Sequence, residues 1–282
     1  MFKEPEIPKY EKETIYEYIK THKFTTVSSL CNYIVSLKND IDKLYGIFCW
    51  AALNIQYDTD AFFSDNIKST TLEEVFNTKK AVCSGYSVFF IEMAKLTKIN
   101  TKKIKICEYS NCSKAYGFDP LNPPKYPKSD HSSIYIEIDG VQFICEPTWA
   151  SGSIGDNKQF TPNFKPHYFL IPIYKSLNSH YPCDESTKLL QIKFPFKDFL
   201  KSPRLRSTTN LKTESNPLVN CECRNGFLEQ IYSCNGPIDC ISFTILLKTN
   251  NKFIEIPNDG IIGYQILQKK IPKHPERCRF KV

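Results

Sequence analysis

A cysteine at the start of a predicted helix occupies a position suited to thiol chemistry. Cys83 lies in the segment KKAVCSGYSVFF, where apolar residues begin to recur at helical spacing. The amides and the dipole of a first helical turn stabilise a thiolate, and the same amides can point at a developing oxyanion. Lys79 and Lys80, just upstream, act on the thiol in the same direction. Cys83 is therefore the candidate nucleophile.

A predicted β-hairpin supplies a base and a group to orient it. The Asp-Gly dipeptide at 139–140 separates two alternating apolar runs, which is a strong signal for a two-residue turn. Such a turn pairs Ile138 with Val141. If the pairing continues along both strands, His131 and Glu146 lie on one face as diagonal neighbours, with Cα atoms about 7–8 Å apart.

The three residues together match a nucleophile, base and orienting group. A carboxylate at Glu146 can accept a hydrogen bond from one nitrogen of His131, which leaves the other nitrogen as a base for Cys83. Residue types alone leave a second interpretation open. An apolar-flanked cysteine is most often a core residue, and a histidine on a strand is most often structural.

Helical periodicity predicts the elements that precede the hairpin. Two short helices are expected within 14–37, with Ser28 or Ser29 as a possible cap for the second. A stronger pattern predicts a helix over 41–55 that Asn39 can cap. Thr71 and Glu74 resemble a capping box for a further short helix, and the nucleophile helix is expected over 82–96.

Strand patterns dominate the remainder of the chain. Alternation predicts a strand over 103–109, and residues 110–130, with four prolines, are expected to form a long loop that is a candidate lid. Further strands are expected over 240–248, 252–256 and 260–266. Helices followed by a meander of strands indicate an α+β fold with a small all-β domain at the C-terminal end.

Composition excludes several classes of protein. The 282 residues include 20 Phe and 16 Tyr, enough for a substantial core, so global disorder is excluded. No apolar run is long enough to span a bilayer, and the N-terminal residues lack the apolar stretch of a secretory signal. A cytoplasmic location is therefore predicted. The twelve cysteines are expected to be free thiols; no pair has CxxC spacing, and neither a metal nor a cofactor is predicted.

The net charge of +7 is unevenly distributed. Residues 191–282 hold 15 Lys and Arg against 8 Asp and Glu, whereas residues 1–190 hold 22 of each. This change predicts a leader with the first helix over 1–25, a core over 26–190 and a basic β domain over 191–282. The excess charge is either a solvated basic face or a patch for an acidic protein or a lipid. No nucleic-acid motif accompanies it.

The motifs also resemble a known family. KKAVCSGYSVFF is similar to the nucleophile motif of the transglutaminase-like superfamily, and SDHSSIYIEIDGVQFICEPTWASG is similar to its histidine and carboxylate hairpin. IFCWAALNIQYD resembles the upstream helix, and PHYFLIP and HYP resemble a downstream segment. The order and spacing of these matches, over about residues 40–200, resemble the kyphoscoliosis peptidase and hillarin branch most closely.

The resemblance implies a papain-like core and a function. Cys83, His131 and Glu146 would form a catalytic triad for acyl transfer on protein carboxamides, as a peptidase, a deamidase or a protein crosslinking enzyme. No calcium loop of the EF-hand type is present. Two features depart from the family pattern: the usual Asp is Glu146, and the aromatic residue and the Asn that follow the histidine are Ser133 and Ile134.

These departures keep a second function open. The branch includes cytoskeletal and cytokinesis-associated members, some of which lack the full triad. The domain can therefore also be a weakly active or inactive interaction scaffold. Residues 191–282 would then bind cytoskeletal or acidic protein partners.

Overall fold

The computed structural model divides the chain into two compact units. Unit 1 comprises residues 1–117 and 124–193, and unit 2 comprises residues 118–123 and 194–282. The described parts of the chain are residues 6–99, 102–115, 118, 123–155, 157–177, 179–190 and 194–201, and beyond them the strands of unit 2 given below.

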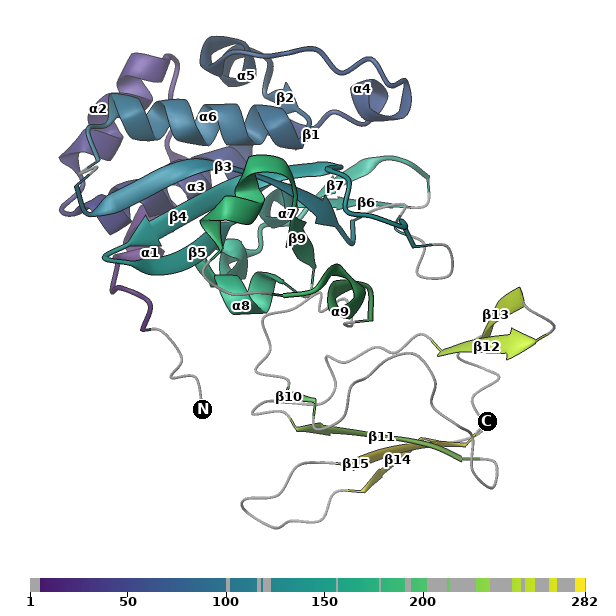
Figure 1. Cartoon of the computed structure of the whole chain (residues 1–282). Helices are drawn as coiled ribbons and strands as arrows, with labels where there is room; N and C mark the ends of the chain where they lie inside the picture. Colours follow the sequence, from purple (N-terminus) through teal and green to yellow (C-terminus); the bar gives the residue numbers. More distant parts are fainter. Residues whose placement is uncertain are drawn as a thin grey trace. The chain divides into compact units, whose positions relative to one another are not determined.

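Unit 1 begins with helices and continues into strands (Figure 1). Its α-helices are α1 (Lys12–Thr21), α2 (Val27–Ser36), α3 (Asp40–Asn54), α4 (Thr59–Phe63), α5 (Leu72–Thr78), α6 (Cys83–Leu96), α7 (Pro147–Ser151) and α8 (Ile173–Ser176). Two 3-10 helices follow the hairpin region, η1 (Pro166–Tyr168) and η2 (Asp184–Leu189).

An antiparallel five-stranded sheet with the order β8-β5-β4-β3-β9 forms the centre of unit 1. Its strands are β3 (Ile104–Ser113), β4 (His131–Ile138), β5 (Val141–Cys145), β8 (Ile171–Pro172) and β9 (His180–Pro182). Two small pairs lie beside it. The strands β1 (Gln56–Tyr57) and β2 (Lys80–Ala81) are parallel, and β6 (Gly152–Ile154) and β7 (Phe160–Pro162) are antiparallel.

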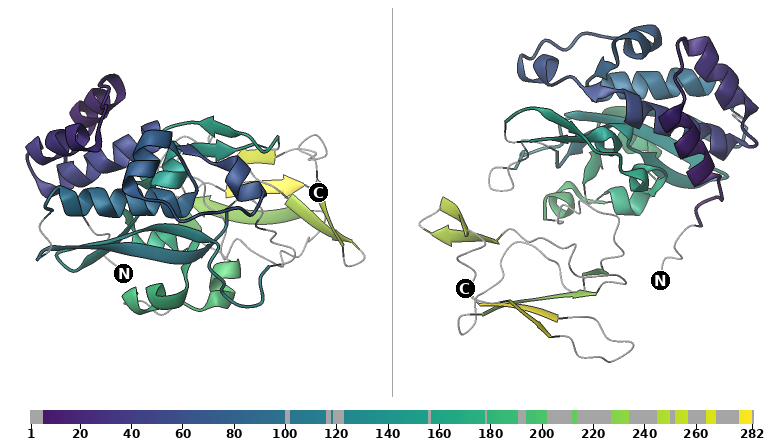
Figure 2. Two further views of the ribbon diagram at one scale, coloured as in Figure 1. Left: turned by 90° about the horizontal axis from the view of Figure 1, so that it is seen from above. Right: turned by 180° about the vertical axis from the view of Figure 1, so that it is seen from behind.

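The two faces of this sheet carry different cores. Alternate residues of β4, such as Ile134 and Ile136, join α3 and α6 in the main hydrophobic cluster. The intervening Tyr135 lies in a smaller cluster with Tyr109 of β3 and Ile173 of α8. Figure 1 shows α6 along one face of the sheet, and the two views in Figure 2 show the helices α1 to α3 beside it. The α+β fold predicted from the sequence is thus confirmed, with a nucleophile helix packed on an antiparallel sheet.

Local signals placed most helix starts correctly. Asn39 caps α3 by accepting from the amides of Ile41 and Asp42, and Thr71 and Glu74 form the predicted capping box of α5. The prediction for α2 was wrong by two or three residues. Its cap is Thr26, whose side chain accepts from the Ser29 amide, because that threonine has the extended backbone a cap requires.

The predicted loop at 110–130 was too long. The strand β3 continues to Ser113 because its far end pairs with β9 as well as with β4. Residues 110–113 are therefore fixed in the sheet, and the lid interpretation applies at most to the residues after them.

Unit 2 contains α9 (Phe196–Lys201) and six strands. Four strands pair in the order β10-β11-β15-β14, with β10 (Lys212–Thr213), β11 (Phe227–Ser233), β15 (Arg277–Lys281) and β14 (Tyr264–Leu267). The strands β12 (Ile245–Thr249) and β13 (Lys252–Ile256) form a separate hairpin. The predicted strands over 240–248, 252–256 and 260–266 correspond to β12, β13 and β14, although 240–244 and 260–263 lie outside the described residues.

No helix among the described residues is long and apolar enough to cross a bilayer.

Gly85 allows α6 to approach β2 closely. A Cβ atom built at this position would lie 2.6 Å from Ala81 Cβ and 3.0 Å from Thr70 Cγ2. We expect Gly85→Ala to destabilise the fold by about 1–3 kcal/mol through this overlap, although alanine is the better helix former. Urea unfolding checks the change, and Leu96→Ala at the exposed end of α6 should stay within about 0.5 kcal/mol. A Gly85→Ala variant as stable as the wild type would contradict the close approach.

Candidate functional site

The start of α6 presents Cys83 to the end of the sheet. Lys79 ends α5 in the left-handed region (φ 56°), and the next two residues form β2 beside β1. The chain then enters α6 with Val82 at its N-cap, where no side chain caps the helix. The thiol of Cys83, in the first turn, is partly exposed. It therefore lies where orphan helix amides and the positive end of the dipole favour a thiolate.

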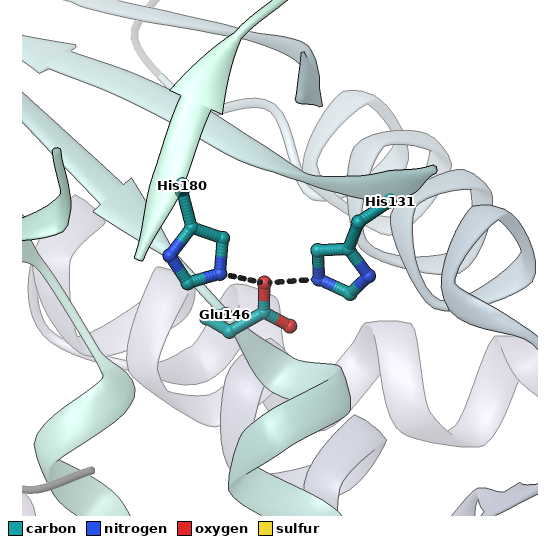
Figure 3. Close-up of side chains that lie close together, drawn as sticks. All are labelled: His131, Glu146 and His180. Atoms are coloured by element: carbon teal, nitrogen blue, oxygen red, sulfur yellow. Dashed lines mark hydrogen bonds and ion pairs between the residues drawn. The ribbon is translucent and has the colours of Figure 1, made fainter. Parts of the chain in front are cut away.

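His131 and Glu146 form a short ion pair below this turn. The Nε2 atom of His131 lies 2.7 Å from Oε2 of Glu146, and neither residue has more than 7% of its surface exposed. Figure 3 shows the second ring nitrogen of His131 pointing away from the carboxylate. Because Glu146 occupies Nε2, Nδ1 is the nitrogen of His131 that remains to interact with Cys83, whose pKa His131 lowers.

The predicted hairpin register is confirmed, but the strand ends earlier than expected. Ile138 pairs with Val141, and the ladder continues to Ile134 opposite Cys145. Glu146 is not a strand residue. It caps α7, and its Oε1 atom accepts from the Trp149 amide at 3.2 Å. The carboxylate still reaches the histidine because the chain turns at the end of β5 towards the start of β4.

Charge and hydrogen bonding shift the pKa values of Cys83, His131 and Glu146. Burial would raise the pKa of Cys83, but the hydrogen bond and charge of His131 and a hydrogen bond to the Ser132 backbone outweigh it and lower the pKa. Burial lowers the pKa of His131, and the charge of Glu146 with the contacts to Cys83 reverses this and raises it well above its ordinary value. These directions favour a thiolate beside an imidazolium.

The same charge interaction between His131 and Glu146 shifts the pKa of Glu146 in the opposite direction. Burial raises the pKa of its carboxyl, but the two neighbouring histidines, His131 first, lower it to about 2. The carboxylate is therefore ionised at every pH above about 2.

His180 is part of this cluster, and the sequence interpretation as a loop residue was wrong. It is a buried residue of β9, and its Nε2 lies 3.3 Å from Oε2 of Glu146 (Figure 3). A strand is recognised by alternating polar and apolar residues, and the three residues of β9 are too few to show this alternation. The only sequence feature that marks the tripeptide HYP is its resemblance to a family segment.

The His-Glu-His group is closer to a hydrogen-bonded set than to a metal centre. The ligand atoms of His131, Glu146 and His180 all lie within 4.8 Å of one another, so a metal has to be considered. A tetrahedral ion with bonds of about 2.0–2.1 Å would hold its ligand atoms more than about 3 Å apart. The 2.7 Å contact is shorter than that and suits a charge-assisted hydrogen bond.

Aromatic residues surround the cluster. The ring of Trp149 lies 4.3 Å from that of His180 and 5.7 Å from that of His131, measured between centroids. Tyr86 donates its hydroxyl to the Ile55 carbonyl at 2.6 Å. Both were expected to pack around the site.

By residue type alone, Trp50 and Gln56 are candidate oxyanion donors. Trp50 is buried between the rings of Phe76 and Phe89, and Gln56 is exposed on β1. Tyr57, which follows Gln56, is a residue near Cys83 that the sequence did not indicate as part of the site. It pairs with Ala81, two residues before the cysteine, and burial together with the charge of Cys83 raises the pKa of its hydroxyl.

The remaining histidines lie outside the cluster. His167 is half-buried in η1, and its ring centroid lies 4.4 Å from that of Tyr168. His22 follows α1 and stacks on Tyr18, and His274 lies outside the described residues.

The low pKa of Glu146 predicts how acid affects stability. Since the folded-state pKa is about 2 against an ordinary 4.5, the ionised carboxylate stabilises the fold fully above about pH 4.5, and this contribution is lost as the pH falls towards 2. We expect the wild type to lose on the order of 3 kcal/mol more than Glu146→Gln between about pH 5 and 2, in urea unfolding. Glu185→Gln, at a highly exposed position, should follow the wild type. Equal pH dependence in all three proteins would contradict the buried ion pair.

Comparison with known proteins agrees with this architecture. The profile of the family described as "Transglutaminase-like domain" matches residues 6–156. The kyphoscoliosis peptidase of Homo sapiens is 21% identical over 187 residues, which cover 66% of this chain and 27% of that protein. The kyphoscoliosis peptidase of Mus musculus is 22% identical over 183 residues, with 63% and 27% covered. The chain thus spans about a quarter of the length of these curated relatives. Since the profile matches more than half of the sequence, this chain belongs to the transglutaminase-like domain family.

Proposed function

We propose that the protein carries out cysteine-dependent acyl transfer on protein or peptide carboxamides. The observation that supports this most directly is the 2.7 Å contact between His131 and the fully buried Glu146, together with Cys83 at a helix N-terminus, where the same imidazole lowers the pKa of the thiol. A structural cysteine or histidine needs no such chain of contacts. The kyphoscoliosis peptidases that the chain resembles carry a proteolytic activity in their name.

Cys83, His131 and Glu146 have separate roles in the proposed reaction. The Sγ of Cys83 attacks the carbonyl carbon, and the first amides of α6 stabilise the oxyanion. The C–N bond then breaks, and the leaving amine or ammonia takes the proton of the His131 imidazolium. Neutral His131 next removes a proton from the acyl acceptor, which attacks the thioester and releases Cys83. Glu146 holds the ring in place and stabilises its charged form.

The acceptor decides which of three products results. Water acting on an acyl-enzyme from a peptide bond gives proteolysis, and water acting on one from a glutamine side chain gives deamidation. An amine gives a crosslink. Incorporation of a labelled amine, release of ammonia and cleavage of a peptide library distinguish these outcomes, and Cys83→Ala should abolish each of them.

The reactivity of Cys83 tests the proposed nucleophile without a substrate. We expect iodoacetamide to alkylate Cys83 at pH 6 to 7, well below the ordinary thiol pKa of about 8.5, and His131→Ala to slow this reaction at least tenfold. Peptide mass spectrometry measures the rate at each pH. Cys107 is an internal control in the same digest, because it is also partly exposed while burial raises the pKa of its thiol.

Two results would contradict the proposal. One is an ordinary titration of Cys83 near pH 8.5, and the other is a rate that His131→Ala leaves unchanged. Either would favour the scaffold function, and capture of acidic or cytoskeletal proteins would then be the next experiment.

We further propose that residues 194–282 form a module separate from the chemistry. Unit 1 contains the whole cluster around Cys83 and ends at residue 193. A chain truncated after residue 193 should therefore keep the alkylation profile of Cys83 within about twofold. Aggregation of the truncated chain, or loss of the activated thiol, would show that the two units depend on each other.

A further inference from the structure

Glu146 has two imidazole neighbours, whereas a nucleophile, base and orienting group need only one. Its Oε2 atom lies 2.7 Å from His131 Nε2 and 3.3 Å from His180 Nε2, and the two rings lie on opposite sides of the carboxylate (Figure 3). The mechanism above uses His131 and leaves His180 without a task. The environment of His180 indicates what that task is.

His180 is held by the sheet and by its neighbours. In β9 it pairs with Ser113 of β3, and its side chain is fully buried. Its ring lies over that of Trp149, with 4.3 Å between centroids. The Ser179 hydroxyl lies 2.8 Å from Nδ1. If this hydroxyl donates to Nδ1 rather than to the Ser176 carbonyl 3.3 Å away, the proton of the neutral ring resides on Nε2, which faces Glu146.

The glutamate needs this restraint. A glutamate side chain has three rotatable bonds, and it must hold Oε2 within hydrogen-bond distance of His131 for the base to keep its orientation. Its Oε1 atom is fixed by the Trp149 amide at 3.2 Å. The 3.3 Å contact with His180 on the far side of Oε2 restricts the remaining freedom of the carboxylate and offsets part of the cost of burying its charge.

We propose that His180 is a positioning residue that holds Glu146 against His131, so that the reactive set is Cys83, His131, Glu146 and His180. This inference rests on the proposed function. His180 itself does not touch the sulfur or the substrate; it acts through the carboxylate.

Asp130 is the other charged group that interacts with both histidines. Its Oδ1 atom accepts from the Ser113 amide at 2.8 Å, and burial raises its pKa while the charges of His131 and His180 lower it. It borders the cluster from the start of β4 and does not replace either contact to Glu146. Any pH profile of the site therefore has to be compared with that of Asp130→Asn.

A pair of variants separates the donor from the ring. His180→Gln keeps an N–H donor but loses the imidazole packing on Trp149, and His180→Leu loses both. In the full-length chain we expect His180→Leu to move the pH profile of Cys83 alkylation upward and to lower the rate at pH 6 about tenfold, as Glu146→Gln does. His180→Gln should stay within about threefold of the wild type at pH 6, because its amide can still donate to Oε2.

The outcomes distinguish the inference from its alternatives. Equal losses in His180→Gln and His180→Leu would mean that the ring serves packing alone, and an unchanged profile in His180→Leu would remove His180 from the site. If His180→Leu fails to fold, Ser179→Ala tests the same chain of contacts and should shift the profile in the same direction; no shift would overturn the inference.

A zinc titration addresses the remaining alternative. Stoichiometric zinc binding that His180→Gln abolishes, together with loss of Cys83 alkylation, would assign the group to a metal instead. Failure of the proposed function is seen separately, as an ordinary thiol titration of Cys83 in the wild-type protein.

Discussion

Burial of the Glu146 carboxylate is the constraint on which the rest of the site depends. A carboxylate removed from water is costly unless charges and donors surround it, and here the side chain is completely buried. The fold meets this demand from three directions: the start of β4 brings His131, β9 brings His180, and the first turn of α7 brings the Trp149 amide. The same contacts that make burial tolerable also fix the orientation of His131. Stability and reactivity therefore share one set of interactions.

The thiol side of the site depends on a different kind of contact, the close packing of α6. Gly85 lets the first turn of the helix lie against β2, and Tyr86 ties that turn to Ile55 through its hydroxyl. Cys83 is thus held by a helix on one face of the sheet, whereas His131 begins β4 and Glu146 caps α7. The interaction between Cys83 and His131, which lowers the pKa of the thiol, joins the two halves. Its strength depends on how rigidly each half is packed.

Local sequence signals predicted the features that local chemistry decides. The turn at 139–140 has positive φ at both residues, as a two-residue hairpin requires, and it fixed the register that places His131 near Glu146. The position of His180 depends instead on pairing between β3 and β9, which are far apart in the sequence. Three residues carry no usable period, so only the three-dimensional fold reveals this neighbour. The early end of β5 has a similar origin, because Glu146 caps α7 rather than extending the ladder.

The two residues after His131 that depart from the family pattern, Ser133 and Ile134, are buried. Ser133 is fully buried, and its hydroxyl accepts from the Asn111 side chain at 3.1 Å. Ile134 is part of the main core with α3 and α6. Both side chains are buried in packing contacts, so their difference from the family pattern alters the packing near His131. The substitution that bears on chemistry is the glutamate, and its extra methylene group is accompanied by an additional contact, the one from His180.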